Sequence, residues 1–369
     1  MTPTDPATLA PEHVRRISPY LPGKPIEELA REMGIDAATI VKLASNENPR
    51  GPGPAVRDAI AATVAELPRY PDANGFALKA ALSQCLRVPQ EHIVLGNGSN
   101  DVLELVSLAF LKPGDEAVYA QHAFIVYPLA TQARGARGVE VPARDFGHDL
   151  DAMRAAVTPR TRVVFIANPN NPTGTWIEPD ALLRFIASVP DDVIVVLDEA
   201  YNEYLRPEQR ARSVDWIASH PNLVVSRTFS KAYGLAALRI GYGVTSAGVA
   251  DMLNRVRQPF NVNTIAQAAA LAALDDADYV EESRLLNEQG MKQLERGLEG
   301  LDVRFVRSHG NFLMANVGDG ASVNMALLKQ GVIVRPIANY GLPSWLRITV
   351  GLPDENTRFL TALAKALRG

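Results

Sequence analysis

The chain has 369 residues, of which 47% are hydrophobic, and this length predicts a large domain with a smaller one rather than a peptide-like scaffold. The 37 basic and 41 acidic residues give a formal net charge of −4 and form no basic stripe, so we expect a small-molecule partner and no nucleic acid. Cys85 is the single cysteine, which excludes an internal disulfide and a thiolate zinc cluster.

The N-terminal segment predicts an arm rather than a domain. Residues 1–45 are rich in proline and short helical pieces, and they are too few to fold alone, so we expect them to pack on the smaller domain and on a dimer partner. The first sixteen residues lack the apolar core of a signal peptide, and no stretch is long enough to span a membrane. We therefore expect a cytoplasmic protein with no membrane partner.

Residues 46–260 alternate between apolar runs and amphipathic stretches, which predicts an α/β domain. "HIVLGNG" (92–98) is typical of a strand that ends in a glycine turn, and "SNDVLELVSLAFL" (99–111) has the apolar spacing of a helix. Further strands are expected within 115–120, 162–170, 193–201, 222–230 and 238–244, and further helices within 124–135 and 178–189. The continuous Val, Ile and Leu runs indicate a mostly parallel sheet covered by helices.

The pattern changes near Phe260, where we place a domain boundary. An alanine-rich helical pattern covers 258–274, and shorter strands are expected within 302–317 and 331–336. Residues 261–369 are therefore predicted to form a smaller α+β domain.

Four loops with unusual polar residues follow the predicted strands of the large domain: "GNGSND" (96–101), "NPNNPTG" (168–174), "DEAY" (198–201) and "SRTFSK" (226–231). In open α/β sheets, ligands bind outside the carboxyl ends of the strands. One such loop could be an ordinary turn. Four loops with complementary chemistry indicate a ligand site.

Lys231 is the candidate nucleophile of this site. Partial desolvation and neighbouring cations would lower the pKa of its amine, although a solvated surface lysine would have the same sequence. Thr228, Ser230 and Arg239 lie close to it in the sequence and supply donors suited to a phosphate beside the amine.

A helix start completes the predicted anion site. The backbone amides of Gly98, Ser99 and Asn100 lie where a phosphate could bind. A capped helix without a ligand is the alternative interpretation of this loop.

Asp198 ends an apolar run, so its carboxylate would be costly to bury without a cation or a protonated ring nitrogen. Tyr201 and Asn171 could donate hydrogen bonds to a phenolate oxygen on the same ring, and Phe124 could stack on it. The alternatives are a helix cap for Asp198 and core positions for Tyr201 and Phe124.

The order of these motifs, with "SRTFSKAYGLAALRIGY" (226–242) and a late "LRITVG" (346–351), resembles the fold-type I pyridoxal-phosphate aminotransferases of class I and II over nearly the whole chain. The resemblance implies that Lys231 is the Schiff-base lysine and that Asp198 is the partner of the pyridine nitrogen. It implies that Tyr201 and Asn171 donate to the ring oxygen. The cofactor phosphate would be held by Thr228, Ser230, Arg239 and the amides of 98–100.

Within this group, "VRRISPYLPGKPIEELAREMGI" (14–35), "KLASNENPRGPGP" (42–54) and "LPRYPD" (67–72) resemble the histidinol-phosphate aminotransferases. This implies transfer of an amino group from L-histidinol phosphate to 2-oxoglutarate in histidine biosynthesis. It also implies a homodimer in which Tyr70 reaches the cofactor phosphate of the neighbouring subunit. Around the substrate, the matching positions are Tyr20, Asn46, Arg335 and Arg347; salt-bridged structural roles are the alternative for the two arginines.

Three other functions are compatible with parts of this pattern. An aromatic amino acid aminotransferase would keep every cofactor residue, and a decarboxylase of a phosphorylated amino acid has the same scaffold and cofactor. An effector module of a transcription regulator is disfavoured, because the lysine and the aspartate are intact and no DNA-binding helical domain precedes the fold. No metal site is expected.

Overall fold

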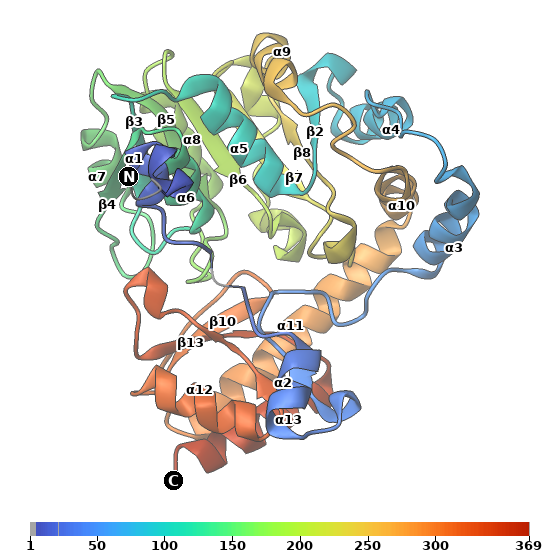
Figure 1. Ribbon diagram of the computed structural model, residues 1–369, viewed down its shortest axis with the longest axis vertical. Helices are drawn as coiled ribbons and strands as arrows, with labels where there is room; N and C mark the ends of the chain where they lie inside the picture. The colour runs from blue at the N-terminus through green and yellow to red at the C-terminus, as the bar shows by residue number, and fades with distance from the viewer. Residues whose placement is uncertain (1–4, 21, 369) are drawn as a thin grey trace.

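The computed structural model describes residues 5–20 and 22–368, and two hydrophobic cores organise them. In Figure 1, the first core lies in the upper part of the molecule, and the C-terminal segment, coloured orange to red, forms the lower part. No helix among the described residues is long and apolar enough to cross a membrane.

A seven-stranded sheet forms the centre of the first core, in the order β2-β8-β7-β6-β5-β3-β4. Its strands are β2 (Ile93–Gly96), β3 (Glu116–Ala120), β4 (Arg137–Val141), β5 (Thr161–Ala167), β6 (Ile194–Asp198), β7 (Leu223–Thr228) and β8 (Gly241–Val244). Only β8 runs antiparallel to its neighbours β2 and β7. The predicted mostly parallel sheet is therefore confirmed, and its Val, Ile and Leu side chains are buried because helices cover both faces.

Helices along the same part of the chain bury apolar side chains against this sheet (Figure 1). They are α3 (Pro54–Thr63), α4 (Phe76–Leu86), α5 (Ser99–Phe110), α6 (Val126–Ala133), α7 (Leu150–Ala155), α8 (Pro179–Ser188), α9 (Ala247–Val256) and α10 (Thr264–Leu274).

The second core is built on a four-stranded antiparallel sheet, in the order β12-β13-β10-β9. Its strands are β9 (Phe305–Val306), β10 (Phe312–Asn316), β12 (Arg335–Pro336) and β13 (Trp345–Thr349). The helices α11 (Ala277–Gly300), α12 (Gly320–Lys329) and α13 (Pro353–Ala366) pack on it. This is the smaller α+β unit that the sequence predicts.

The two cores divide later than the predicted boundary near Phe260. Small alanine side chains of α10, from Ala266 to Ala273, pack in the first core, so this helix belongs with the large sheet. Met291, in the middle of α11, belongs to the second core. The chain therefore passes from one core to the other along α11.

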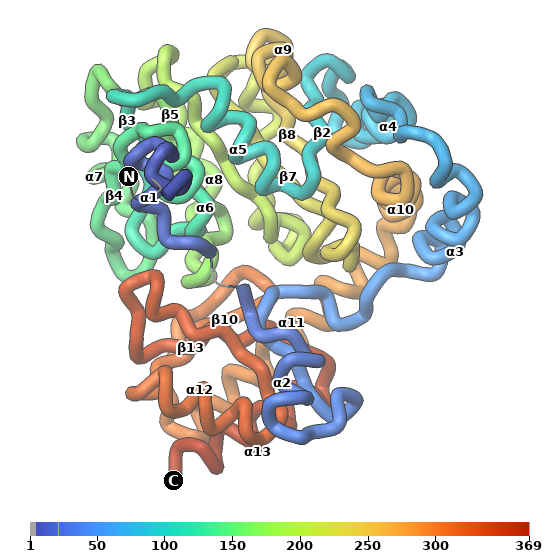
Figure 2. The backbone as a smooth tube through the Cα atoms, in the orientation of Figure 1, coloured from blue at the N-terminus to red at the C-terminus, as the bar shows by residue number. Residues whose placement is uncertain are grey.

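The N-terminal arm contacts both parts of the molecule, and Figure 2 follows its path. The short helix α1 (Glu12–Arg15) lies beside α6. Further along, α2 (Ile26–Met33) buries Leu29 against Leu328 and Ile333, and β1 (Val41–Lys42) pairs in parallel with β11 (Val332–Ile333). The arm thus packs on the smaller unit for most of its length.

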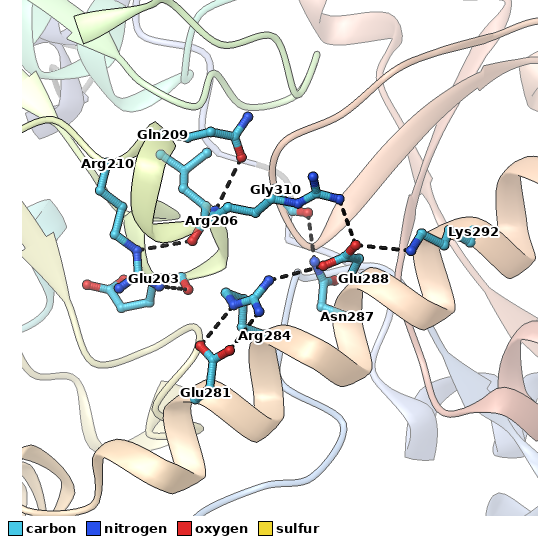
Figure 3. Close-up of polar contacts among 11 residues, drawn as sticks. Glu203, Arg206, Gln209, Arg210, Glu281, Arg284, Asn287, Glu288, Lys292 and Gly310 are labelled. Carbon is cyan, nitrogen blue, oxygen red and sulfur yellow. Dashed lines mark hydrogen bonds and ion pairs between the residues drawn. The ribbon is translucent and has the colours of Figure 1, made fainter.

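Glu288 on α11 forms ion pairs with Arg206, in the segment after β6, and with Arg284 of the same helix (Figure 3). One carboxylate oxygen of Glu288 lies 2.7 Å from Arg206 Nη2, and the other lies 3.1 Å from Arg284 Nη1. Nearby, Asn287 donates to the carbonyl oxygen of Gly310. The Arg206–Glu288 pair therefore links the segment after β6 to the helix along which the chain passes into the smaller unit.

Candidate active site

A cavity of about 190 Å³ lies between the two units, at the carboxyl ends of the strands of the large sheet. It brings together most of the residues that the sequence singled out. Its walls include Tyr20, Asn46, Ser99, Asn100, Phe124, Asn171, Asp198, Tyr201, Thr228, Ser230, Lys231, Arg239, Arg335 and Arg347.

Lys231 follows β7, and its amine is held inside the cavity. Nζ donates to the carbonyl oxygen of Ser45 at 3.0 Å and lies 5.8 Å from the centre of the Tyr201 ring. Burial lowers the pKa of Lys231 to about 7, and the positive charges of Arg347 and Arg239 act in the same direction. Because an amine with this pKa is half neutral near pH 7, Lys231 can act as a nucleophile and as a base.

Asp198 is the last residue of β6, and its carboxylate is buried in the wall of the same cavity. Tyr127 donates its hydroxyl proton to Oδ2 at 2.9 Å, and the amide of Ala200 donates to Oδ1 at 3.2 Å. Burial raises the pKa of Asp198 to about 6, although both hydrogen bonds lower it. The carboxylate is therefore mostly ionised at neutral pH and can accept a proton donor from a ligand.

Donors for an anion gather at the other end of the cavity. Arg239 Nη1 donates to Ser230 Oγ at 3.3 Å, and the Ser230 amide donates to Thr228 Oγ1 at 3.1 Å. The N-terminus of α5 faces the same place, since a side chain at Gly98 would collide with Arg239. Gly98 also has φ 83°, which favours glycine. Open amides beside a guanidinium suit a phosphate.

Tyr201 and Asn171 lie on the wall beside Lys231. The Tyr201 hydroxyl accepts from Asn46 Nδ2 at 2.9 Å, which leaves its own proton to donate, and burial raises the pKa of this phenol to about 12. The side-chain oxygen of Asn171 accepts from Arg347, so its NH₂ group remains to donate. The side-chain oxygen of Asn46 accepts a hydrogen bond from Thr349, which fixes the amide of Asn46. In this position the NH₂ group of Asn46 donates to the Tyr201 hydroxyl.

Arg347 on β13 reaches the cavity from the smaller unit and is only 7% exposed. Nη1 donates to Asn171 Oδ1 and Nη2 to the carbonyl oxygen of Ala44, both at 2.6 Å, whereas Nε is buried without a hydrogen-bond partner. The guanidinium of Arg335 lies 5.5 Å from the centre of the Tyr20 ring. The two arginines together make this side of the cavity electropositive.

Some site residues were not found from the sequence. Tyr127 lies within a stretch whose pattern indicates only a helix, and Tyr340 ends a short 3-10 helix of the smaller unit that shows no motif. Ser45 contributes a backbone carbonyl, which no side-chain pattern can reveal. The hydrogen bond from Tyr127 to Asp198 is a tertiary contact between α6 and β6, so only the fold shows it.

Tyr70 lies apart from the cavity of its own chain. It is 82% exposed, and its ring stacks on Phe260 with 4.7 Å between the ring centres. The described residues contain no group of three or more His, Cys, Asp or Glu side chains that could hold a metal ion.

Comparisons with known proteins find relatives over nearly the whole chain. The family model of aminotransferase class I and II matches residues 38–363. Histidinol-phosphate aminotransferase 1 of Cupriavidus pinatubonensis is 60% identical, and the match covers 97% of this chain and 96% of the relative. Histidinol-phosphate aminotransferase 2 of Pseudomonas aeruginosa is 59% identical, and the match covers 97% of this chain and 98% of the relative. The crystal structure of histidinol-phosphate aminotransferase from Sinorhizobium meliloti in complex with pyridoxal-5'-phosphate superposes with a TM-score of 0.88, at 29% identity over 97% of both chains.

Proposed function

Because the chain belongs to the histidinol-phosphate aminotransferases of aminotransferase class I and II, we propose that it transfers the amino group of L-histidinol phosphate to 2-oxoglutarate. The products are imidazole-acetol phosphate and L-glutamate, and the reaction belongs to histidine biosynthesis. The observation that carries this proposal is the buried amine of Lys231 in one cavity with the Asp198 carboxylate and the anion donors around Arg239.

The residues of the cavity fit pyridoxal 5'-phosphate. Its phosphate would be held by Thr228, Ser230, Arg239 and the amides of Gly98, Ser99 and Asn100, and its ring nitrogen by the carboxylate of Asp198. Phe124 lines the cavity where an aromatic face can stack on the ring, and the donors on Tyr201 and Asn171 suit the ring oxygen. When bound, this cofactor supplies an electron sink for the negative charge that develops on the substrate Cα.

Lys231 moves the proton in this reaction. Its amine, with a pKa of about 7, can take the proton from the substrate Cα and would then deliver it to C4′ of the bound cofactor. A pKa near the working pH suits both the removal and the return of a proton. The Asp198 carboxylate would pair with the protonated ring nitrogen of the cofactor. The hydrogen bond from Asn46 orients the Tyr201 hydroxyl toward the ring oxygen. The carbonyl of Ser45 orients the lysine before substrate binds.

Arg347 and Arg335 bind the anions of the two substrates. Histidinol phosphate carries a phosphate, whereas 2-oxoglutarate and glutamate carry a distal carboxylate, and a guanidinium can bind either with paired hydrogen bonds. The unpartnered Nε of Arg347 supports this role, because a buried donor without a partner is costly unless a ligand satisfies it.

Kinetics of the purified, cofactor-loaded enzyme test the substrate. We expect a larger kcat/KM for histidinol phosphate than for phenylalanine or tyrosine, each paired with 2-oxoglutarate. A preference for the aromatic amino acids would support the aromatic aminotransferase. Release of carbon dioxide from a phosphorylated amino acid without any need for a keto acid would support the decarboxylase.

A homodimer with shared sites is the second part of the proposal. Exposed apolar side chains occur along the segment that leads from α3 into α4, at Val64, Leu67, Tyr70 and Phe76, and the exposed Phe260 stacks on Tyr70. Exposed apolar surface of this kind favours association with another chain. Because Tyr70 does not line the cavity of its own chain, a second copy would place it at the neighbouring site, as the family resemblance implies.

We also place the enzyme in the cytoplasm. Cys85 is a free, exposed thiol, which fits a reducing compartment. Fractionation of cells that produce the protein would test this, and recovery from an oxidising compartment would contradict it.

A further inference from the structure

Tyr127 is buried against Asp198 and Phe124, two residues of the cavity wall, and the mechanism above does not use it. Its side chain is 0% exposed, and its hydroxyl donates to Asp198 Oδ2 at 2.9 Å. The ring stacks on Phe165 at 4.8 Å with an interplanar angle of 6°, so the hydroxyl has little freedom to turn away from the carboxylate. One residue of the first turn of α6 thus fixes one carboxylate oxygen at the end of β6.

The same ring also holds the aromatic wall of the cavity. Phe124 packs edge-on against Tyr127, with 5.9 Å between ring centres and an interplanar angle of 87°. The amide of Tyr127 donates to the carbonyl oxygen of Phe124 at 3.0 Å, which closes the turn that leads into α6. Tyr127 therefore contacts two of the residues assigned to the cofactor ring, Asp198, which would face its nitrogen, and Phe124, which would face its plane.

We propose that Tyr127 is a positioning residue that keeps Asp198 ionised and aimed at the cofactor ring nitrogen. The inference rests on the proposed function, because it assumes that Asp198 holds this nitrogen. A hydroxyl that donates to a carboxylate favours its charged form. The remaining lone pairs of the carboxylate stay available to the ligand, since the amide of Ala200 and the hydroxyl of Tyr127 occupy one position on each oxygen.

The direction of the effect follows from the groups around Asp198. Burial and the neighbouring charge of Glu199 raise the pKa of Asp198, whereas the hydrogen bond from Tyr127 and the charge of Lys231 lower it. Tyr201 also faces this carboxylate, and burial keeps its hydroxyl neutral. Removal of the Tyr127 hydroxyl therefore raises the pKa of Asp198, and protonation then competes with cofactor binding at a higher pH.

Tyr127→Phe removes only the hydroxyl and keeps the ring that packs on Phe165 and Phe124. The holoenzyme is equilibrated in buffers from pH 5 to pH 8, and the cofactor that remains bound gives a dissociation constant at each pH. We expect the pH at which affinity falls to move upward by about one unit, which is a roughly fivefold loss of affinity at pH 6 that approaches tenfold at pH 5. Tyr119→Phe is the matched control, because Tyr119 is a buried tyrosine of β3 outside this cavity.

The same measurement in an Asp198→Asn background separates positioning from packing. If Tyr127 acts through the carboxylate, Tyr127→Phe adds no further loss in this background, because an amide has no charge to stabilise. An unchanged pH profile in Tyr127→Phe, or a loss that is equal at every pH and persists in the Asp198→Asn background, would overturn the inference. If Asp198→Asn itself binds cofactor and turns over normally, the proposed role of Asp198 fails instead.

Discussion

Replacement of Arg347 by lysine tests the proposed substrate site with a change of one functional group. Arg347 uses Nη1 and Nη2 to hold Asn171 and the carbonyl of Ala44, both at 2.6 Å, and Nε is the buried donor that remains for a ligand. A lysine at this position keeps the positive charge but loses the planar fork. Its single ammonium group cannot satisfy Asn171, Ala44 and a substrate anion in the same geometry.

The expected loss can be estimated from one charge-assisted hydrogen bond. Such a bond contributes about 1.5–3 kcal/mol, and each ~1.4 kcal/mol is a factor of ten, so kcat/KM should fall by roughly 10- to 150-fold. The fall should affect both histidinol phosphate and 2-oxoglutarate, because the same arginine would bind the anion of each. Cofactor affinity should change less, through the lost contact with Asn171 alone.

The assay measures kcat/KM for both substrates, cofactor affinity and the melting temperature in the same preparation. Arg358→Lys is the matched control, because Arg358 lies on α13 and donates to the carbonyl of Gln330 outside the cavity. A lower melting temperature with unaltered kcat/KM in the folded Arg347→Lys protein would refute the reasoning, since it would make Arg347 a structural residue.

Three further predictions follow from the same geometry. Lys231→Met should stabilise the cofactor-free protein at pH 7 by at least about 1.4 kcal/mol, and this advantage should shrink toward pH 10, as denaturant unfolding at each pH would show. The sign follows from the lowered pKa of Lys231, because between pH 7 and 10.5 the unfolded chain binds a proton that the folded chain lacks. Wild-type stability therefore rises with pH in that window. A difference in unfolding free energy between variant and wild type that stays constant with pH would contradict this prediction. Asp198→Asn should retain some cofactor yet lose transamination by a factor of about a hundred or more, since removal of one partner from a buried charge pair costs about 3–5 kcal/mol; near-normal turnover would remove Asp198 from the mechanism. Mixing Tyr70→Phe subunits with Lys231→Ala subunits should restore part of the activity in hybrid dimers, where one site carries both defects and the other neither; no gain after proven subunit exchange would argue against shared sites.

The sequence predicted the large sheet because its strands are buried on both faces and consist of continuous Val, Ile and Leu runs. The antiparallel direction of β8 was not predicted, since a strand's direction leaves no trace in its hydrophobic pattern. The assignment of α10 was also missed. Its alanines fit closely against the first core, and an alanine-rich helix has no pattern that says which core it will join.

The site was predictable where chemistry-bearing residues follow strands. Asp198 ends a strand of the large sheet, and Asn171 and Lys231 lie in the loops that follow two other strands, so the fold brings their side chains to one edge. Tyr127 and Tyr340 were missed because tertiary packing alone carries them to this edge.

The most direct test of the account is to follow the transferred nitrogen. Purified holoenzyme is given L-histidinol phosphate labelled with ¹⁵N in its amino group, together with 2-oxoglutarate, and the products are analysed by mass spectrometry. The account predicts ¹⁵N-glutamate and imidazole-acetol phosphate in equal amounts, and no reaction in Lys231→Ala. If the 2-oxoglutarate is recovered unreacted with histidinol phosphate, while the same preparation transfers nitrogen from phenylalanine to 2-oxoglutarate, the proposed substrate is contradicted.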